Sequence, residues 1–559
     1  MAYFLKQTPN GNRIYLSIVD SHYSGTKKGT AHSIYKSLRS VEYWKENGID
    51  DPIAHFQKEV DRLNEEREKD KIKEIEELSP ERYLGYFVAK AILDKLKIGK
   101  YVNYFDLATG FDFKLYDILS SLIYARLVKP CSKYKTYYEV LPYLFENYDF
   151  SYDQLLAGLA YIGNDYEKFV ELFTMQYNSI YGIKSDTTYF DCTNFYFEID
   201  KEDDLRRKGP SKENKKDPII GLGLLLDANV IPIGMKIYPG NESEKPVINK
   251  VIDDLKSKNN ISGKTIRVAD KGLNSAKNVY EAKLRHDGYI FSKSVKNLPE
   301  KEKVWVLLDN DYHDIKDKEG KLLYRYKECI DEFPYEFIDD NNKKVSFHIK
   351  EKRVITYNPS LAKKKLYEID KMIDKAANLV LSKAKREEYG ESSRYVNFKG
   401  RDGEKAIASL NQKKIEDDKR LAGYNLIVSS ELKMSASELY GVYHNLWHIE
   451  ESFKIMKSDL DARPVYLKTE ETIKGHFTIC YLATLIERIF EFIILKDKYS
   501  HTAIFDLFHK LKVIKINDRY INITASTDLL RYLKENTKLP ITNYILTESQ
   551  INKTLNWKI

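Results

Sequence analysis

The alternation of apolar and polar residues along the chain predicts strands and helices in separate blocks. In residues 1–40, stretches such as RIYLSIVDSHYS alternate, and NGN and GTKKGT stand between them as turns, which predicts a small β-ribbon. Residues 51–78 are highly charged but carry apolar residues at helical spacing, and residues 84–181 contain several helix-like stretches. We therefore expect a β-ribbon in 1–40 and a mainly helical region in 41–183.

The amino-acid composition changes near residue 187, where β-branched and aromatic residues begin to predominate. TTYFDCTNFYFEI predicts a strand, and IIGLGLLLDA and VIPIGMKIY predict two more, joined by a short turn. A helix to about residue 258, the strand KTIRVAD, the helix KGLNSAKNVYEAKL and the strand-like GYIFSKSV follow. The order is β-β-β-α-β-α, with a fourth strand that could pair in parallel and a fifth strand after it. This order predicts an α/β core whose first part is 184–296.

From residue 297 to 420 this pattern is interrupted. KVWVLLD, KKVSFHI and KRVITY are short strand candidates, and AKKKLYEIDKMIDKAA predicts a lysine-rich helix. Because a structureless loop of this length is implausible in a compact domain, 297–420 is interpreted as a β-rich and helical insertion into the sheet. A last strand, GYNLIVSS, opens the second part of the core, 421–500, and we expect a helical C-terminal region in 501–559.

Composition narrows these possibilities only in part. A chain of 559 residues is too long for one ordinary core, so we expect two to four domains. The net charge of +7 permits a nucleic-acid partner without requiring one. The four cysteines show no zinc-binding or disulfide spacing, and the N-terminus lacks a signal-peptide core. Because the apolar run FTICYLATLI is far shorter than the roughly 20 residues of a membrane span, we expect a soluble, cytoplasmic protein.

Three carboxylates stand in settings that are costly for a charge. The sequence contains no Walker loop, no GxGxxG after a strand and no HExxH. Asp191 interrupts an apolar and aromatic strand, Asp270 ends another strand, and Glu450 lies on a helix between apolar neighbours. Simpler interpretations exist: Asp270 could cap a helix or form a turn, and Asp186 is a loop-like competitor of Asp191. Glu450 taken alone could be an ordinary surface residue.

Convergence of these three side chains would make a metal site. Their separations along the chain form no local motif, so the fold would have to bring two strand ends and a helix together. Three acidic groups at one edge can hold two divalent ions about 3.5–4 Å apart. Oxygen ligands favour Mg²⁺ or Mn²⁺, and such a pair stabilises the attacking and leaving oxygens of an in-line phosphoryl displacement.

The stretch YHNLWHIEESFKIMK, residues 443–457, predicts a helix with an apolar and a charged side. Tyr443, Glu450 and Lys457 are spaced i, i+7 and i+14, so on one α-helix they would differ by only about 20° and share a face. Lys454 lies close to that face, whereas Glu451 is turned about 100° away and is assigned to solvation alone. A carboxylate between a phenol and an ammonium suits an anionic polymer. The apolar residues expected to pack are Leu446, Ile449, Phe453 and Met456.

The pattern Y-x2-L-x3-E-x6-K in this stretch resembles the tyrosine–arginine–glutamate–lysine signature of bacterial insertion-sequence transposases of the DDE class. YFDCTNFYFE is similar to the first-aspartate strand of that family, and VADKGLNSAKN is similar to its second-aspartate motif. WHIEESFKIMKSDLDARPVY resembles the third block, and IKGHFTICYLA resembles the helix that follows it. The resemblance covers about 187–490, and four blocks in the family's order make it specific.

This resemblance implies a ribonuclease-H-like catalytic core: a mixed sheet flanked by helices, with a β-rich insertion and a mainly helical N-terminal region. It implies that Asp191, Asp270 and Glu450 bind two Mg²⁺ or Mn²⁺ ions. Metal-activated water would cut the element end, and the freed 3′-hydroxyl would attack target DNA. Tyr443 and Lys457 would hold phosphates near the cut. The implied partners are double-stranded DNA, both terminal inverted repeats and target, and a second copy of the chain in a synaptic complex, without a membrane.

One position departs from the signature, because Leu446 occupies the slot of the arginine. The phosphate contact of that arginine is then absent or is supplied from elsewhere. His444 and His448 are possible substitutes, although each could equally be a satisfied or solvent-facing histidine. The way the DNA end is handled, including any hairpin intermediate, therefore stays open.

Further contacts with DNA are expected at basic residues around these blocks. The loop RRKGPSKENKK, residues 206–216, has six basic residues to one acidic residue, although it could be only a solvated loop. The helical region 41–183 is where the resemblance places recognition of the terminal repeats. The individual candidates are Lys212, Lys271, Lys454 and Arg463.

Two other functions remain open from the residues alone. The same core could be a metal-dependent DNA nuclease that performs no strand transfer. The chain could also be a non-catalytic, transposase-derived DNA-binding regulator. Retention of all three carboxylates and of Lys457 argues against the regulator, since a DNA-binding protein need not keep an acidic cluster beside DNA.

Overall fold

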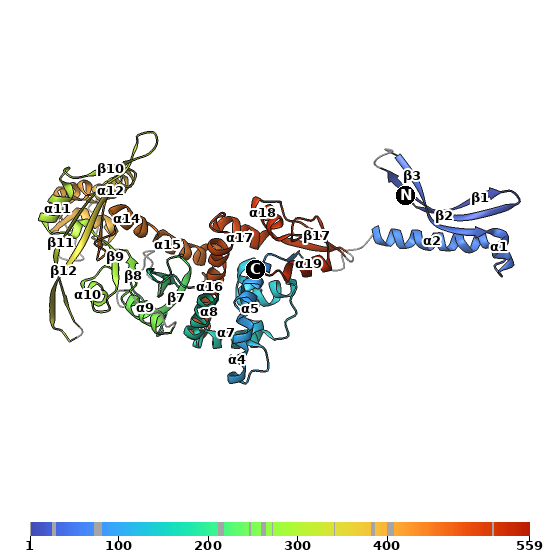
Figure 1. Ribbon diagram of the computed structural model, residues 1–559, viewed down its shortest axis with the longest axis horizontal. Helices are drawn as coiled ribbons and strands as arrows, with labels where there is room; N and C mark the ends of the chain where they lie inside the picture. Colours follow the sequence, from blue (N-terminus) through green and yellow to red (C-terminus); the bar gives the residue numbers. More distant parts are fainter. Residues whose placement is uncertain are drawn as a thin grey trace. The chain divides into compact units, whose positions relative to one another are not determined.

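The protein is described by a computed structural model (Figure 1). The described residues are 2–24, 29–71, 81–210, 217–244, 247–258, 264–270, 272–339, 341–381, 386–399, 407–516 and 519–559. The chain forms two compact units, residues 1–80 and residues 81–559, and each is treated by itself.

The first unit is a three-stranded antiparallel sheet with two helices (Figure 1). Its elements are β1 (Tyr3–Asn10), β2 (Arg13–Ser24), β3 (Gly29–Ser40), α1 (Val41–Glu46) and α2 (Pro52–Lys71). The strands pair in chain order, which confirms the predicted β-ribbon. Val41 and Phe56 from the helices pack against Leu16 of β2 in a small core of their own. The helices α1 and α2 thus share a core with the ribbon, although the sequence pattern groups them with the helical region that follows.

The second unit contains a nine-stranded mixed sheet in the order β10-β11-β12-β15-β9-β8-β5-β6-β7. Its first strands and helices are β5 (Thr187–Tyr196), β6 (Ile219–Leu226), β7 (Pro232–Pro239), α9 (Val247–Lys258), β8 (Ile266–Ala269), α10 (Ala276–Leu284) and β9 (Gly288–Lys293). Strands β5, β6 and β7 are antiparallel, whereas β8 pairs in parallel with β5 and β9 pairs in parallel with β8. The predicted order and the predicted parallel pairing are both confirmed, and the core is ribonuclease-H-like.

The segment between β9 and the last core strand extends the same sheet. Its elements are α11 (Glu300–Leu307), β10 (His313–Lys316), β11 (Leu322–Ile338), β12 (Lys344–Tyr357), α12 (Pro359–Leu381), β13 (Val396–Lys399), β14 (Ile407–Leu410), α13 (Gln412–Arg420) and β15 (Tyr424–Ser429). The lysine-rich helix and the last strand are confirmed. KKVSFHI and KRVITY, predicted as two strands, are one strand, β12, because β11 pairs with it along its whole length.

The prediction of a strand for KVWVLLD was wrong, since most of this stretch lies in helix α11. Pro299 stands at the N-cap, and Glu300 and Glu302 lie in the first turn of the helix. Proline at a helix start and acidic residues near the positive end of the helix dipole both favour the helix. These local signals outweigh the β-propensity of the valines and the tryptophan.

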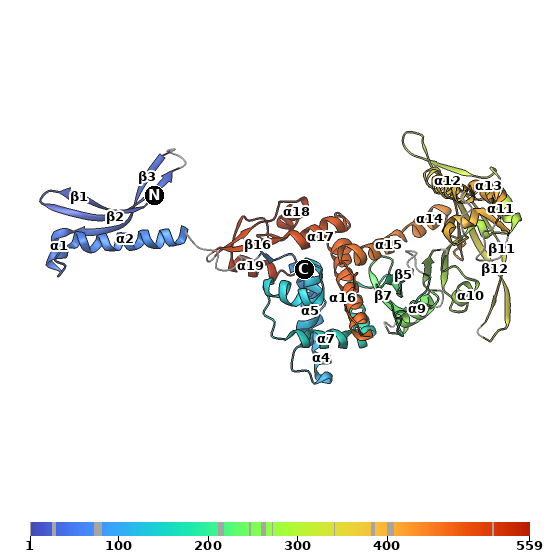
Figure 2. The same ribbon diagram turned by 180° about the vertical axis from the view of Figure 1, so that it is seen from behind.

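A helical layer in the second unit joins two segments that are far apart in sequence. The first supplies β4 (Glu81–Tyr83), α3 (Phe87–Lys95), α4 (Ile98–Thr109), α5 (Leu115–Val128), α6 (Lys133–Lys135), α7 (Tyr152–Asn164) and α8 (Tyr166–Tyr181). The second supplies α16 (Glu470–Arg488), α17 (His501–Lys510), β16 (Lys512–Ile516), β17 (Arg519–Asn522), α18 (Asp528–Thr537), β18 (Ile545–Thr547) and α19 (Glu548–Leu555). Figure 2 shows α16 beside α5 and α7.

The C-terminal region contains strands as well as helices, whereas the sequence pattern predicts helices alone. Strand β16 pairs with β4 at the start of the second unit, and the sheet β18-β17-β16-β4 ties the two segments together. The strands are only three to five residues long, too short for a clear alternation of apolar and polar residues.

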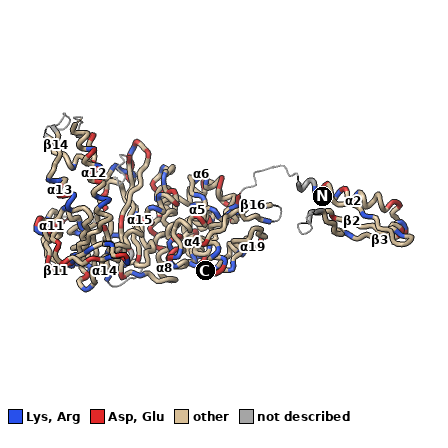
Figure 3. The backbone as a smooth tube through the Cα atoms, turned by 90° about the horizontal axis from the view of Figure 1, so that it is seen from above, with Lys and Arg blue, Asp and Glu red and all other residues tan. Residues whose placement is uncertain are grey.

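Charges of both signs are interspersed along the backbone of the second unit (Figure 3). This mixture agrees with the small net charge and means that basic sites must be sought as local clusters. Among the described residues, no helix combines the length and the apolar character that a membrane crossing requires.

Candidate functional site

Two aspartates lie side by side where strands β5 and β8 pair in the sheet. Asp191 is a half-buried position within β5, with buried residues on both sides of it along the strand. The parallel register sets Tyr189 opposite Val268, and continuing it by two residues brings Asp270 level with Asp191. The order of the strands thus brings together two carboxylates that are 79 positions apart in sequence.

The third carboxylate comes from a helix that crosses this part of the sheet. Glu450 is exposed on α15 (Trp447–Lys454), while its neighbours Ile449 and Phe453 are buried. A pocket of about 190 Å³ is lined by Asp191, Asp270 and Glu450 together. The remaining lining residues are Tyr443, His444, Leu446, Trp447 and Ile449.

Two hydrogen bonds hold the helical segment over the aspartates. The hydroxyl of Tyr443, on α14 (Ala436–His444), donates to Oδ1 of Asp270 at 2.9 Å. The side-chain amide of Asn445 donates to the hydroxyl of Tyr189 at 3.2 Å, two residues before Asp191 on β5. Burial and the charge of Asp270 raise the pKa of the Tyr443 hydroxyl, so it stays a proton donor.

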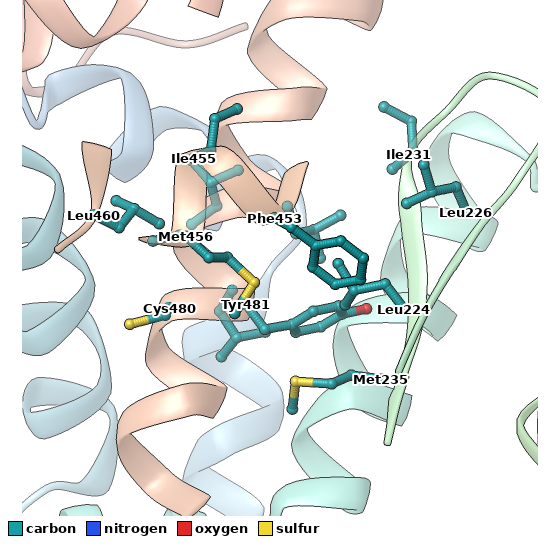
Figure 4. Close-up of a cluster of buried hydrophobic side chains, with 14 of the residues drawn as sticks. Leu224, Leu226, Ile231, Met235, Phe453, Ile455, Met456, Leu460, Cys480 and Tyr481 are labelled. Carbon is teal, nitrogen blue, oxygen red and sulfur yellow. The ribbon is translucent and has the colours of Figure 1, made fainter. Parts of the chain in front are cut away.

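Apolar packing fixes the same helix from its other side. Leu446, Ile449, Phe453 and Met456 are buried, as the sequence predicted. Figure 4 shows side chains from this helix packed between the sheet strands β6 and β7 and helix α16. The labelled residues are Leu224, Leu226, Ile231, Met235, Phe453, Ile455, Met456, Leu460, Cys480 and Tyr481.

The stretch 443–457 is not the single straight α-helix that the spacing assumed. The amide of Leu446 bonds to the carbonyl of Tyr443, and the amide of Ile449 bonds to that of Leu446. These i to i−3 bonds tighten the junction between α14 and α15. Beyond α15, residues Ile455–Asp459 form a π-helix, η5, which carries Lys457. The expected 20° alignment of Tyr443, Glu450 and Lys457 assumed one regular α-helix, which the structure does not have here, and the first two residues line one pocket.

Three of the basic residues predicted to contact DNA lie in the described part of the chain, and none of these three lines the pocket. Lys457 places its ammonium 5.3 Å from the ring centre of Phe195, at the end of β5. Arg463 lies 4.6 Å from the ring centre of the next residue, Tyr196. Lys454 is exposed on α15. Lys212 and Lys271 lie outside the described residues.

Leu446, in the slot of the signature's arginine, is 8% exposed and lines the pocket. His444 also lines the pocket and stacks on Tyr440 with an interplanar angle of 8°. His448 is directed elsewhere, since Nδ1 lies 3.7 Å from Glu451 and its ring packs edge-on against Phe492. Of the two proposed histidine substitutes, His444 is the one at the pocket.

The structure contradicts the assignment of Glu451 to solvation alone. Its carboxylate lies 3.0 Å from Arg488, which is fully buried, and 2.9 Å from Nδ1 of His501. Burial would raise the pKa of Glu451, but contacts with His448, His501 and Arg488 outweigh it and hold the pKa far below its usual range. Sequence spacing could not reveal this role, because Arg488 and His501 approach from α16 and α17.

Of the simpler interpretations of the aspartates, a turn at Asp270 is present, since its carbonyl accepts a hydrogen bond from the amide of Leu273, but the helix cap is not. Ser275 caps helix α10 by accepting a hydrogen bond from the amide of Asn278, so Asp270 is not its N-cap. Asp186 is exposed before β5 and is not among the residues that line the pocket.

The donor set suits hard divalent cations, because all three acidic groups are carboxylates in one pocket. Within the described residues, no three His, Cys, Asp or Glu side chains are already close enough to enclose an ion. The pocket thus offers ligands from three separate elements and not a closed cage.

Comparison with known proteins identifies the chemistry of this fold. Residues 197–486 match the family described as Transposase DDE domain. The match includes Asp270 and Glu450 but begins just after Asp191, so it does not bear on that residue. No curated protein matches the chain. Because the family match spans more than half of the chain, the protein belongs to the DDE transposases, a family of phosphoryl-transfer enzymes that act on DNA.

Proposed function

We propose that this transposase cuts DNA at the ends of a bacterial insertion sequence and joins the freed 3′-hydroxyl to target DNA. The observation that carries the proposal is the pocket lined by Asp191, Asp270 and Glu450, three carboxylates from three different elements. Enzymes of this family generally use divalent metal ions, and two Mg²⁺ or Mn²⁺ ions held by these carboxylates would activate water and stabilise the displaced oxygen.

The residues of the chain then have separate tasks. Asp191, Asp270 and Glu450 bind the ions, and Tyr443 orients Asp270 by its hydrogen bond. Attack of water on the phosphodiester at the element end breaks the bond to the 3′-oxygen and releases a 3′-hydroxyl. In the second step, that hydroxyl attacks a target phosphodiester and a new 3′-oxygen leaves, so each step exchanges one phosphorus–oxygen bond for another.

DNA would be held along the basic residues beside the pocket. Lys457 and Arg463 lie over the aromatic end of β5, and Lys454 is exposed on the helix of Glu450. Lys212 and Lys271 are further candidates from the sequence alone. Cations at these positions would pair with phosphates on either side of the cut and would make binding depend on salt. Two copies of the chain would bring the two inverted repeats together.

The test is an assay with Mg²⁺ and DNA that carries the sequences flanking the coding region. Wild-type protein should give cleaved and joined products. Asp191→Asn and Glu450→Gln should each lower the cleavage rate at least about 100-fold, since metal ligation stabilises the transition state by several kcal/mol. Asp186→Asn, an exposed carboxylate outside the pocket, is the matched control and should cleave normally.

The same assay separates the rival functions. Cleavage without joining would identify a nuclease, and binding without cleavage would identify a DNA-binding regulator. Full cleavage by Asp191→Asn or Glu450→Gln would refute the assignment of the catalytic residues.

A further inference from the structure

A second pocket, of about 590 Å³, lies between the segment that follows α5 and the segment that precedes α16. Its lining residues carry four basic groups and one carboxylate, that of Asp461. The basic residues are Arg126, Lys133, Lys135 and His476. Such a local excess of positive charge stands out in a unit where charges of both signs are otherwise mixed (Figure 3).

Three of the basic side chains are almost fully buried: Arg126 and His476 are 4% exposed and Lys133 is 5% exposed. The ammonium of Lys133 lies 3.1 Å from Nδ1 of His476, and Nε2 of His476 lies 3.0 Å from the carbonyl of Ala462. Because Nε2–H must donate to that carbonyl, Nδ1 is the acceptor for Lys133 and the imidazole is neutral. Burial and the charge of Lys133 lower the pKa of His476, which agrees with a neutral ring.

Lys133 therefore has a neutral partner and no counter-charge. Across the described part of the chain, no ion pair joins it to a carboxylate, and the nearby cation Arg126 opposes its charge. Arg126 itself is bound to backbone carbonyls, those of Leu460 and Cys131, and not to an acid. Burial, and after it the charge of Arg126, lowers the pKa of Lys133, so an anion bound in this pocket would stabilise the charged form of that side chain.

The mouth of the pocket carries exposed aromatic rings. Tyr134 is 60% exposed and Tyr466 is 73% exposed. Tyr134 lies with its ring centre 5.8 Å from that of Tyr152, which also lines the pocket. Aromatic rings beside basic groups are the usual combination in sites for nucleic-acid strands, where the rings contact sugars and bases.

The pocket also belongs to the chain segment that leaves the candidate active site. Residues 461–467 follow η5, which carries Lys457, after the single residue Leu460, and they include Arg463, whose guanidinium lies over Tyr196 of β5. Arg126 bonds to the carbonyl of Leu460 at 3.2 Å and so ties the pocket to the end of η5. DNA held at Lys457 and Arg463 would continue along this segment.

We propose that this pocket binds a phosphate group of a DNA strand, with Lys133 and Lys135 as its cationic ligands and Tyr134 and Tyr466 against the neighbouring nucleoside. A phosphate would place an opposite charge beside the ammonium of Lys133, and charge-assisted hydrogen bonds to a phosphate are strong. The inference rests on the proposed function, which makes DNA the source of the phosphate. A free phosphate or nucleotide could bind through the same contacts. The experiment distinguishes these small ligands from DNA.

The experiment measures the affinity of the full chain for a labelled element-end duplex at several salt concentrations, without divalent metal. Lys133→Met and Lys135→Met should each weaken binding and reduce the slope of log Kd against log salt by about 1, the value for one lost phosphate contact. Lys534→Met, an exposed lysine on α18, is the matched control and should bind as the wild type does. In a second arm, inorganic phosphate should raise the unfolding temperature of the wild type but not of Lys133→Met.

Wild-type affinity and slope in both pocket variants would overturn the proposal. If Lys133→Met does not fold, the exposed Lys135 decides the result, because its replacement leaves the buried network intact. If phosphate binding depends on Lys133 but the salt slope for DNA binding is unchanged in both pocket variants, the natural ligand is not a DNA phosphate. That result would overturn DNA as the source of the phosphate. A protein that shows the slope change but does not cleave with Mg²⁺ would refute the proposed function and leave this pocket supported.

Discussion

At the scale of single residues, two different roles can be assigned to the hydroxyl of Tyr443. The signature resemblance assigns it to a DNA phosphate, whereas the structure shows it donating to Asp270 at 2.9 Å. A phenol that donates to a metal-binding carboxylate orients that carboxylate and does not itself need to touch DNA. The two roles differ in what the loss of the hydroxyl would change.

Tyr443→Phe removes the donor and keeps the ring. We expect the cleavage rate at saturating DNA to fall about 10- to 100-fold while Kd for DNA stays unchanged, because a hydrogen bond to a charged group contributes about 1.5–3 kcal/mol. Single-turnover cleavage and fluorescence anisotropy measure the two quantities. Tyr440→Phe, on the same helix, is the control. Weaker DNA binding at an unchanged rate would instead show a direct phosphate contact.

At the scale of elements, buried charges lock the helix of Glu450 to the helical layer. Arg488 is fully buried at the end of α16 and contacts both Glu451 of α15 and Glu491 of the π-helix η6 (Ile489–Ile494). His501 of α17 reaches the same Glu451 carboxylate. Because Glu450 directly precedes Glu451 in the chain, these contacts set the rotation of α15 that turns Glu450 toward the pocket.

Glu451→Gln should destabilise the protein by about 3 kcal/mol at pH 7, since it leaves the buried charge of Arg488 partly uncompensated. The pKa of Glu451 is lowered in the folded state from an ordinary value of 4.5, so its contribution is complete above that pH and is lost as the pH falls below it. The difference between variant and wild type should therefore shrink below about pH 4.5. Urea unfolding at several pH values measures this.

A matched control for that series is Glu470→Gln. Glu470 pairs with Lys474 on the surface of α16, and an exposed pair of this kind contributes only about 0.5 kcal/mol. A Glu451→Gln variant as stable as Glu470→Gln at pH 7 would show that the buried network does not hold α15.

At the scale of the whole molecule, two segments about 300 residues apart meet with almost no side chains between them. A Cβ atom on Gly163 of α7 would lie 1.7 Å from the carbonyl oxygen of Glu471, and one on Gly475 of α16 would lie 2.2 Å from that of Leu159. Both contacts are to backbone, which cannot move aside as a flexible side chain can. These glycines therefore set the distance between the N-terminal helices and α16.

Gly475→Ala should lower the free energy of unfolding by about 2–3 kcal/mol, because it forces α7 and α16 apart. Gly441→Ala on α14 is the control, since a Cβ there would meet nothing within 4 Å and alanine favours a helix. Chemical denaturation of both variants gives the comparison. Equal stability of Gly475→Ala and wild type would mean that the two helices are not held at this distance.

The sequence predicts a structural feature correctly where the signal for that feature is local. The β-β-β-α-β-α order, the β-ribbon and the lysine-rich helix follow from local composition and the spacing of apolar residues, and the structure confirms them. The strand predicted at KVWVLLD failed because α11 begins at a proline and two acidic residues that outweigh its β-branched residues. The assumed straight helix at 443–457 failed because periodicity does not report a tightened turn or a π-helix.

By itself, the sequence determined which residues are candidates for chemistry: Asp191 in an apolar strand, Asp270 at a strand end and Glu450 in an apolar helical setting. Only the tertiary structure decided that the three line one pocket, because this depends on the parallel pairing of β5 with β8 and on the packing of α15 across them. The same holds for Glu451 and for Lys133. Their partners come from elements far away in sequence, so no spacing along the chain could have distinguished them from solvated side chains.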